Sequence, residues 1–463
     1  MDQLGRQPPR PAATDLRPEI TGGAGRDHAV AREEEPAGRV FGESHTFSAF
    51  VPTDDFLIDI RQLRRVRVDP HHPEGPRVRM EAGASVAEVD AALEPRPVIP
   101  TNVVLTSVRY GGLIATGCHG SGLHLPPLSD YVIEMDVVAG PAGRPPPPPP
   151  PAPPPGAEGM DAARLGFGLF GILESLTLRA EPSFNVHHVD RTRADLDATL
   201  GDLEAIVRAH DYCDLYWFPF SRHVWLKTYH RTDRPITVGP GRARIERAYQ
   251  QSGMGVGRLF YRWLRRRPQD TPAICRGLAR FIPSRDVVEP VLGGIHFQTA
   301  IERMNARNLE IGFALDDFDD VRRAWRAAME RVDRHARAGR WPLNLALNAR
   351  FLGRSRALLS PCHGRDHTCF IEIMSYRGTP GWDEFVDDLG GAWIELPGAA
   401  PHWPKEFEAI PGVFDRIAAR YGDNLRRFAA LRRSLDVDPD DLFVNPLTRR
   451  ILALGESPPA GSS

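Results

Sequence analysis

Short runs of alternating apolar and polar residues make up much of the chain between residues 39 and 180, and one segment there has helical spacing. The helical segment, SVAEVDAALE at 85–94, begins with Ser85, a favourable N-cap residue. The alternating runs predict strands. These runs are RVFGESHTF (39–47), FLIDI (56–60), RVRVD (65–69), RVRME (77–81), Tyr131–Val138 and Ile172–Leu178. Strands interspersed with a helix indicate an α/β or α+β domain.

The second half of the chain has longer elements. Apolar residues recur at three- and four-residue spacing over Asp317–Ala338 and Gly412–Arg433, which predicts two amphipathic helices. Two alternating segments, 343–352 and 367–376, are of the kind that builds a sheet with one face toward a ligand. The strand-like segments are Leu215–Thr228, Ile295–Leu315, LNLALNARFL (343–352) and HTCFIEIMSY (367–376).

Two segments lack any such pattern. Residues 1–38 are rich in Pro, Gly and charge, so we expect them to be poorly ordered, with Asp27–Glu35 as their only helix-like piece. The proline-rich loop 141–158 contains the unbroken run Pro145–Pro151. Proline offers no N–H, so this run is polyproline II or irregular. It is either a solvated loop or a ligand for a proline-binding partner.

Composition excludes several classes of function. Lys and Arg number 58 against 60 Asp and Glu, so the net charge of −2 indicates neither nucleic acid nor an anionic membrane as a partner. The five cysteines are odd in number and lack C-x-x-C spacing, which argues against a disulfide framework and a structural zinc site. With no apolar run of 18 residues and a polar start, we expect a cytoplasmic protein without a signal peptide or membrane span. The oligomeric state stays open.

Three glycine-rich turns accompany the predicted strands of the first half: Gly42–Thr46, Gly111–Gly122 and Gly166–Gly171. Glycine lets backbone N–H groups approach a ligand closely, because no Cβ intervenes. Hydroxyls such as those of Thr116 and Ser121 add hydrogen bonds without bulk. Three such turns in one region predict a site for the pyrophosphate of a nucleotide cofactor.

Other candidate sites have simpler explanations. His363 and His367 have the i, i+4 spacing of a helical metal pair, but a glycine lies between them and no third ligand is near, so we expect loop histidines and no metal. The basic run Tyr261–Arg267 either binds an anionic partner or solvates a helix face. The aromatic residues at 216–220 either belong to the core or form the wall of a substrate cavity.

Nine motifs in a fixed order carry a resemblance to a known family. They are GESHTFS, VPTDDFLIDIRQL, GGLIATGCHGSG, LSDYVIEMDVV, ARLGFGLFGIL, WFPF, LLSP, PHWPK and FVNPL. Together they resemble FAD-linked oxidases of the vanillyl-alcohol-oxidase type, which have a PCMH-type FAD-binding domain. Within that superfamily the chain is most similar to sugar-1,4-lactone oxidases (gulonolactone and arabinonolactone oxidases) and to alditol oxidases. The resemblance covers roughly residues 39–450.

The resemblance implies FAD as the cofactor. The family's first loop, G-x-G-H-S, corresponds to Gly42–Thr46, where His45 matches the histidine that carries the flavin covalently in many members and Ser44 replaces a glycine. The second loop, A-T-G-T-H-G-S-G, corresponds to residues 115–122, where Cys118 replaces a threonine and is either a reactive thiol or a small buried residue. The implied cofactor-binding residues are Gly42, Ser44, His45, Thr46, Thr116, Gly117, Cys118, His119, Gly120, Ser121, Gly122 and Ile172.

The resemblance also implies three residues on the substrate side. The family has an E-x-R pair and a lysine in an H-W-x-K segment; Arg350 and Lys405 match, whereas Asn348 stands in the place of the glutamate. A cation near the flavin stabilises the negative charge of the reduced ring, and the carboxylate accepts the proton of a substrate hydroxyl. An asparagine accepts a hydrogen bond but has no useful proton affinity, so Asn348 predicts weak turnover or a different substrate.

We therefore expect an α+β flavoprotein. A two-subdomain FAD-binding domain would span 39–180, a cap domain with an antiparallel sheet flanked by helices 181–415, and a C-terminal segment, 416–463, would return to the FAD domain. The reaction would transfer hydride from a CH–OH group of a sugar lactone, alditol or related alcohol to FAD, with O2 as the acceptor. Two alternatives are a flavin-binding pseudoenzyme, suggested by Asn348, and a non-catalytic interaction protein that uses the proline and basic runs.

Overall fold

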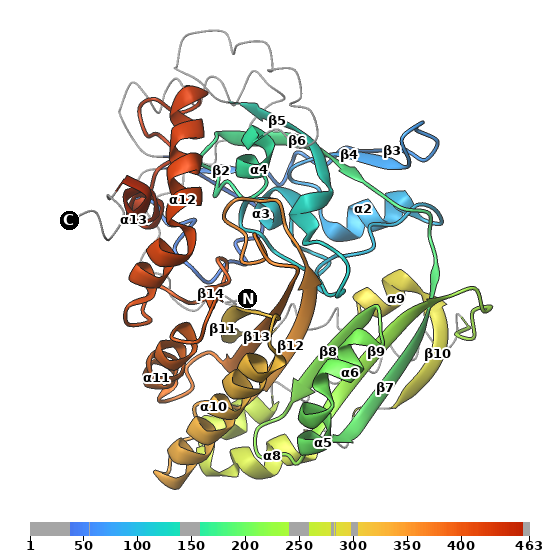
Figure 1. Ribbon diagram of the computed structural model, residues 1–463, viewed down its shortest axis with the longest axis vertical. Helices are drawn as coiled ribbons and strands as arrows, with labels where there is room; N and C mark the ends of the chain where they lie inside the picture. The colour runs from blue at the N-terminus through green and yellow to red at the C-terminus, as the bar shows by residue number, and fades with distance from the viewer. Residues whose placement is uncertain are drawn as a thin grey trace.

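The computed structural model describes residues 38–54, 56–138, 158–239, 259–278, 282, 284–297 and 304–456. The poorly ordered N-terminus expected at 1–38, apart from its last residue, and the run Pro145–Pro151 lie outside these ranges, so the expectations for them stay predictions. Within the ranges the chain is an α+β protein in which a smaller and a larger β-sheet region lie next to each other (Figure 1).

The first region contains two small sheets. Strand β1 (Gly38–Phe41) pairs in parallel with β2 (Phe56–Asp59). A four-stranded antiparallel sheet has the order β3-β4-β6-β5. Its strands are β3 (Val66–Asp69), β4 (Arg77–Glu81), β6 (Ile172–Arg179) and β5 (Val132–Val138). The helical elements here are α2 (Val86–Leu93), α3 (Tyr110–Ala115), η1 (Leu128–Tyr131) and α4 (Glu158–Ala163).

An eight-stranded antiparallel sheet dominates the second region (Figure 1). In spatial order its strands are β10 (Arg285–Pro290), β7 (Asn185–Asp195), β9 (His223–Thr232), β8 (Tyr212–Trp217), β12 (Ala346–Gly353), β13 (His367–Tyr376), β11 (Ala306–Ala314) and β14 (Ala400–Pro401). The helices that pack on this sheet include α5 (Leu196–Gly201), α6 (Leu203–Arg208), α9 (Val291–Ile295), α10 (Phe318–Arg337) and α11 (Trp382–Ile394). The segment between β9 and β10 includes η2 (Pro268–Asp270) and α8 (Thr271–Leu278).

The two faces of the central strands differ in chemistry because side chains alternate across a sheet. On β12, Leu347, Ala349 and Phe351 belong to the main hydrophobic core with the helices. Asn348 and Arg350 point to the other face, since they occupy the intervening positions. The same alternation on β11 and β13 places Glu310 and Glu372 on that polar face.

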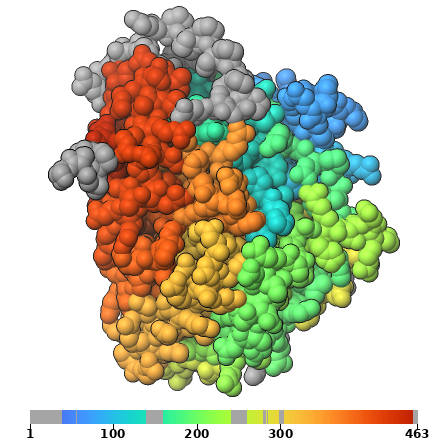
Figure 2. Space-filling model, viewed as in Figure 1, coloured from blue at the N-terminus to red at the C-terminus, as the bar shows by residue number. Residues whose placement is uncertain are grey.

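The C-terminal helices connect the two regions. Helix α12 (Val413–Ser434) contacts α4 in the first region and α11 and β14 in the second, and α13 (Pro446–Glu456) packs on it. In the space-filling view this segment, in red, extends along one side of the molecule (Figure 2). Leu442 and Phe443, between the two helices, are buried in the core of the first region, and Gly38 donates its N–H to the Leu442 carbonyl at 2.8 Å.

Most elements predicted from periodicity are confirmed. Helix α2 begins after Ser85, which forms a capping box with Glu88, and α10 and α12 match the two amphipathic helices. The predicted strand 215–228 was wrong as one element, because it contains the end of β8, a turn and most of β9. Phe220 in that turn adopts φ 68°.

Candidate active site

A cavity of about 870 Å3 lies between the two regions. Its volume is in the upper part of the range for cofactor and ligand sites, about 300–1,000 Å3. From the first region the wall includes the segment after β1, helix α3, and the turn before β6. From the second region it includes the polar face of the large sheet. The predicted cofactor-binding loops and the predicted substrate-binding strand therefore border one cavity.

Seven of the twelve predicted cofactor residues line this cavity: Gly42, Ser44, His45, Thr46, Thr116, Cys118 and His119. Ser44 has φ 53°, in the left-handed region that glycine adopts easily and other residues adopt at a cost. The backbone therefore keeps at Ser44 a conformation suited to the glycine of the family loop. His45, the residue that follows, is exposed toward the cavity.

The other five predicted cofactor residues do not line the main cavity: Gly117, Gly120, Ser121, Gly122 and Ile172. The glycines among them allow close packing of the chain, because a Cβ at Gly120 would lie 2.4 Å from the Asn102 carbonyl oxygen. Gly120 and Ser121 border a small adjoining cavity of about 30 Å3. Ile172 is buried in the core of the first region, and its neighbours Gly171 and Leu173 line the main cavity instead.

The wall fits a flavin nucleotide in two respects. At Gly112 on α3, an added Cβ would meet no atom of the described chain within 4 Å, so the backbone of this helix faces the open cavity. Small hydroxyl residues, Ser44, Thr46 and Thr116, also line the cavity; the hydroxyls of Thr46 and Thr116 donate to the Pro404 and Gly112 carbonyls, so their lone pairs remain to accept from a ribose hydroxyl. A bare backbone next to hydroxyls suits close approach of a cofactor.

The substrate end of the cavity is formed by charged and amide side chains of the large sheet. Asn348 and Arg350 come from β12, Glu372 from β13, Asn308 and Glu310 from β11. Lys405 reaches this group from the segment after β14. The three predicted catalytic residues, Asn348, Arg350 and Lys405, therefore line the same cavity.

Glu372 lies at the centre of this group. It accepts hydrogen bonds from Lys405 Nζ at 2.6 Å, from Asn308 Nδ2 at 2.8 Å and from Asn348 Nδ2 at 2.8 Å. Burial opposes the charge of Lys405, but Glu372 and Glu310 outweigh it and raise the pKa of Lys405 above its ordinary value. Lys405 therefore stays a cation although its side chain is only 20% exposed.

Arg350 is the second cation of the substrate end. Its Nη2 donates to the Tyr216 hydroxyl at 3.1 Å. Burial opposes its charge, but Tyr216, Asp214 and Glu372 outweigh burial and raise the pKa of Arg350 further. Arg350 and Lys405 are thus two fixed cations in the wall of the cavity, held among the carboxylates of Glu372, Glu310 and Asp214.

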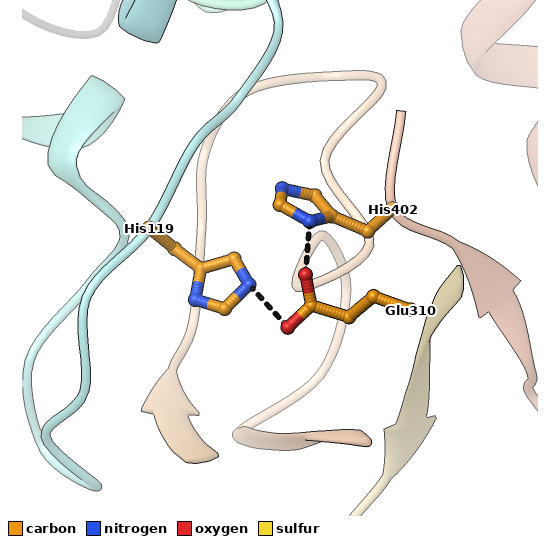
Figure 3. A group of neighbouring side chains, drawn as sticks. All are labelled: His119, Glu310 and His402. Carbon is orange, nitrogen blue, oxygen red and sulfur yellow. Dashed lines mark hydrogen bonds and ion pairs between the residues drawn. The ribbon is translucent and has the colours of Figure 1, made fainter. Parts of the chain in front are cut away.

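His119, Glu310 and His402 form a buried group beside Lys405 (Figure 3). His402 Nδ1 is 2.5 Å from Glu310 Oε2, and His119 Nε2 is 3.5 Å from Glu310 Oε1. Burial would raise the pKa of Glu310, but His402 and His119 outweigh it and hold the pKa well below its ordinary range. These residue types also bind metals, and among the described residues this is the group with metal-ligand spacing. The distances are those of direct hydrogen-bonded and ionic contact.

A second buried polar group lies at the far end of the cavity. Lys227 Nζ is 2.9 Å from Asp190 Oδ1, and His188 bridges Asp190 and Glu289 at 2.9 and 2.6 Å. Lys227 also stands 4.0 Å from the centre of the Phe297 ring. The remaining wall here is largely aromatic and aliphatic. Its residues include Tyr216, Phe218, Trp225, Tyr261, Leu278, Ile282, Leu345, Met374 and Tyr376.

The remaining candidates are placed as follows. Burial raises the pKa of the Cys118 thiol, which favours the small buried residue over the reactive thiol. All five cysteines are free, as predicted. His363 and His367 are not part of the metal-like group found in the described residues. In the basic run, Tyr261 lines the cavity and donates to the Arg377 carbonyl at 2.7 Å.

Sequence reasoning missed Glu372, Glu310 and His402. Each acid interrupts a strongly apolar strand, and an acid inside such a strand is a signal, since buried carboxylates are rare without a partner. His402 is the first residue of the H-W-x-K segment, in which the resemblance implies a role only for Lys405.

Comparisons with known proteins place most of the chain in one family. The profile of the D-arabinono-1,4-lactone oxidase family matches residues 176–451, and that of an FAD-binding domain matches residues 28–145. The chain is 28% identical over 424 residues to an L-gulono-1,4-lactone dehydrogenase of Mycobacterium tuberculosis, covering 89% of this chain and 90% of the relative. It is 28% identical over 392 residues to an alditol oxidase of a Streptomyces species, covering 81% of both chains.

The fold has close counterparts among solved structures. Cholesterol oxidase from B. sterolicum superimposes with a TM-score of 0.76 at 15% identity and covers 94% of this chain and 93% of its own. At this identity the likeness concerns the fold. Among the described residues, no helix has both the length and the apolar character needed to cross a membrane.

Proposed function

Because the chain belongs to the D-arabinono-1,4-lactone oxidase family and contains an FAD-binding domain, we propose that it oxidises a CH–OH group of a sugar-1,4-lactone, with O2 as the acceptor. The lactone is supported by the names of its relatives, which are lactone dehydrogenases and oxidases as well as an alditol oxidase. Both oxidases and a dehydrogenase occur among these relatives, so the reoxidation of the flavin decides the acceptor.

One observation carries the proposal. A single cavity connects the loop at His45 with the buried ionic group of Lys405, Glu372 and Arg350. A cofactor held at the first end and a small substrate held at the second would meet inside it. Bound FAD would supply the electron acceptor for the substrate carbon.

The residues of the substrate end have separable tasks in this proposal. Lys405 is oriented by Glu372 and Arg350 by Tyr216, so both cations are fixed before the substrate arrives. They attract the substrate oxygens and stabilise the negative charge that develops during oxidation. The two sheet residues between them, Asn308 and Asn348, present amide oxygens for substrate hydroxyls.

At the cofactor end, His45 would tether FAD covalently. Its support is the match to the family loop, its exposure toward the cavity, and the left-handed backbone of Ser44 before it. The hydroxyls of Thr46 and Thr116 would bond the cofactor from either side of the cavity.

Purified protein tests the proposal directly. We expect a flavin absorption band, loss of that band on anaerobic addition of a sugar-1,4-lactone, and its return with peroxide release on admission of O2. A panel of gulono-, galactono- and arabinono-lactones and alditols would give the substrate. Return of the band with a quinone or dye but not with O2 would contradict the acceptor. Flavin that no lactone or alditol reduces would contradict the function.

The aromatic end of the cavity favours a second substrate class. Trp225 and Phe297, whose ring centres lie 5.8 Å apart, line the cavity and can bury an apolar portion of an alcohol. Apolar secondary alcohols therefore belong in the same panel. If apolar secondary alcohols reduce the flavin faster than any lactone does, such an alcohol takes the place of the lactone as the proposed substrate.

A further inference from the structure

The carboxylate expected in the substrate end is present, but on the neighbouring strand. In the resemblance, the acid of the E-x-R pair falls at Asn348 of β12. In the structure, Glu372 of β13 is the direct antiparallel partner of Asn348. Such partners have Cβ atoms about 5 Å apart and project to the same face of the sheet. The carboxylate thus lies on β13 instead of β12, and it still lines the cavity.

Three hydrogen-bond donors fix the orientation of Glu372. Lys405, Asn308 and Asn348 all donate to it, and the side chain is only 8% exposed. Three donors to two oxygens leave lone pairs that can accept one further hydrogen bond. A substrate hydroxyl in the cavity is a suitable donor.

The amides on either side are also prepared for a ligand. Among the described residues, neither Asn348 Oδ1 nor Asn308 Oδ1 has a hydrogen-bond partner, although both atoms are buried. Because their NH2 groups are used on Glu372, each amide has only its oxygen left to form a further hydrogen bond, as an acceptor. A buried acceptor without a partner is costly, and a ligand hydroxyl would relieve that cost.

We propose that Glu372 is the catalytic base of this enzyme and takes the role that the family glutamate would have at position 348. This inference rests on the proposed function. The substrate O–H and C–H bonds break and a C=O bond forms; the proton goes to Glu372 and the hydride, with its two electrons, to bound FAD. Asn348 orients Glu372 and accepts a second substrate hydroxyl. The asparagine at 348 therefore does not make the protein a pseudoenzyme.

The alternative is that Glu372 serves only to hold Lys405. Both roles predict that Glu372→Gln disturbs the site, so activity alone does not separate them. An exchange of the two residues does: Asn348→Glu with Glu372→Asn keeps composition and charge and returns the carboxylate to the facing strand. A base can act from either of two adjacent positions on one face, whereas the lysine contact is lost in the exchange.

We expect Glu372→Gln to slow anaerobic flavin reduction at least about 100-fold, the usual effect of removing a general base, with the substrate Kd changed less than about threefold, since a base acts mainly in the transition state. The exchange variant should be at least about tenfold faster than Glu372→Asn alone. Asn348→Glu alone should be slower than wild type, because two carboxylates then face each other. Glu384→Gln, at an exposed ion pair on α11, is the control.

A readout independent of turnover is the affinity for sulfite, an anion that adds to oxidised flavins. Removing a carboxylate beside the flavin should tighten sulfite binding about tenfold in Glu372→Gln, by the Coulomb energy of charges a few ångströms apart. Unchanged sulfite affinity, or flavin reduction within about threefold of wild type, would overturn the role of Glu372. An exchange variant no faster than Glu372→Asn would also overturn it. Wild-type flavin that no lactone or alcohol reduces would instead overturn the proposed function, and the base with it.

Discussion

His402 Nδ1 and Glu310 Oε2 lie 2.5 Å apart, and this contact joins the segment that carries Lys405 to strand β11. His119, on the other side of Glu310, belongs to the glycine-rich segment of the first region. One buried carboxylate thus links three segments around the cavity, and the orientation of the cofactor loop relative to the sheet depends on it.

Glu310→Gln should therefore destabilise the protein and weaken FAD retention together. Removal of one member of a buried ionic group costs about 3–5 kcal/mol, and one of the two histidines would face the NH2 group of the glutamine in place of a carboxylate oxygen. The free energy of unfolding in urea, and the FAD remaining after gel filtration, measure the two effects. Glu384→Gln, which breaks an exposed ion pair, should change stability by less than about 1 kcal/mol. Equal stability of both variants would contradict the linking role.

The left-handed backbone at Ser44 gives a second prediction. Because φ is 53°, Ser44→Gly removes backbone strain, whereas Ser44→Ala retains it. Glycine also loses more conformational entropy on folding, so the useful comparison is between variants. We expect the glycine variant to be more stable than the alanine variant by about 1 kcal/mol, with flavin content at least equal to wild type. A more stable alanine variant would show that the serine is not strained.

Covalent attachment of FAD at His45 is testable apart from activity. After precipitation with acid, wild-type protein should keep its yellow colour in the pellet, and His45→Ala should release flavin into the supernatant. Because the cavity wall of the alanine variant is otherwise intact, it should still bind FAD before precipitation. His124→Ala, a histidine outside this cavity wall, should behave as wild type. Release of flavin from wild type would contradict the tether.

Local sequence signals were sufficient for the elements that frame the site. The capping box of Ser85 and Glu88 marks the start of α2, and alternation marks β12 and β13. Each of these signals is contained within a few consecutive residues. The turn between β8 and β9 has no glycine, because Phe220 adopts the positive φ there. The sequence therefore predicts one strand where the structure has a hairpin.

The chemistry of the site depended on contacts between distant residues. Asn348 and Glu372 are 24 positions apart, and Glu310 and His402 are 92 apart, so only strand register and tertiary packing bring them together. An asparagine stands where the resemblance implies an acid, and the acid within the apolar segment 367–376 is visible in the sequence, but its register opposite Asn348 is not. The division into an FAD domain, a cap domain and a returning C-terminal segment stays a prediction, although Leu442 packs in the core of the first region.

The buried pair of Asp190 and Lys227 predicts acid sensitivity. Burial would raise the pKa of Asp190, but Lys227 and His188 outweigh it and lower the pKa to about 2. A carboxyl with a lower pKa in the folded state stabilises the protein above its unfolded pKa, near 4. That contribution, about 2 kcal/mol for a shift of this size, is lost as the pH falls from about 4 to about 2.

Unfolding in urea between pH 2 and 7 measures this effect in wild type and in Asp190→Asn. The variant should be less stable at pH 7 by about 3–5 kcal/mol, because Lys227 remains buried without its carboxylate. The difference between the two proteins should shrink as the pH falls below 4, since protonation of Asp190 abolishes the pair in wild type as well. Asp387→Asn, at an exposed position on α11, should follow wild type throughout. A stability difference for Asp190→Asn that is independent of pH would contradict the low pKa of Asp190.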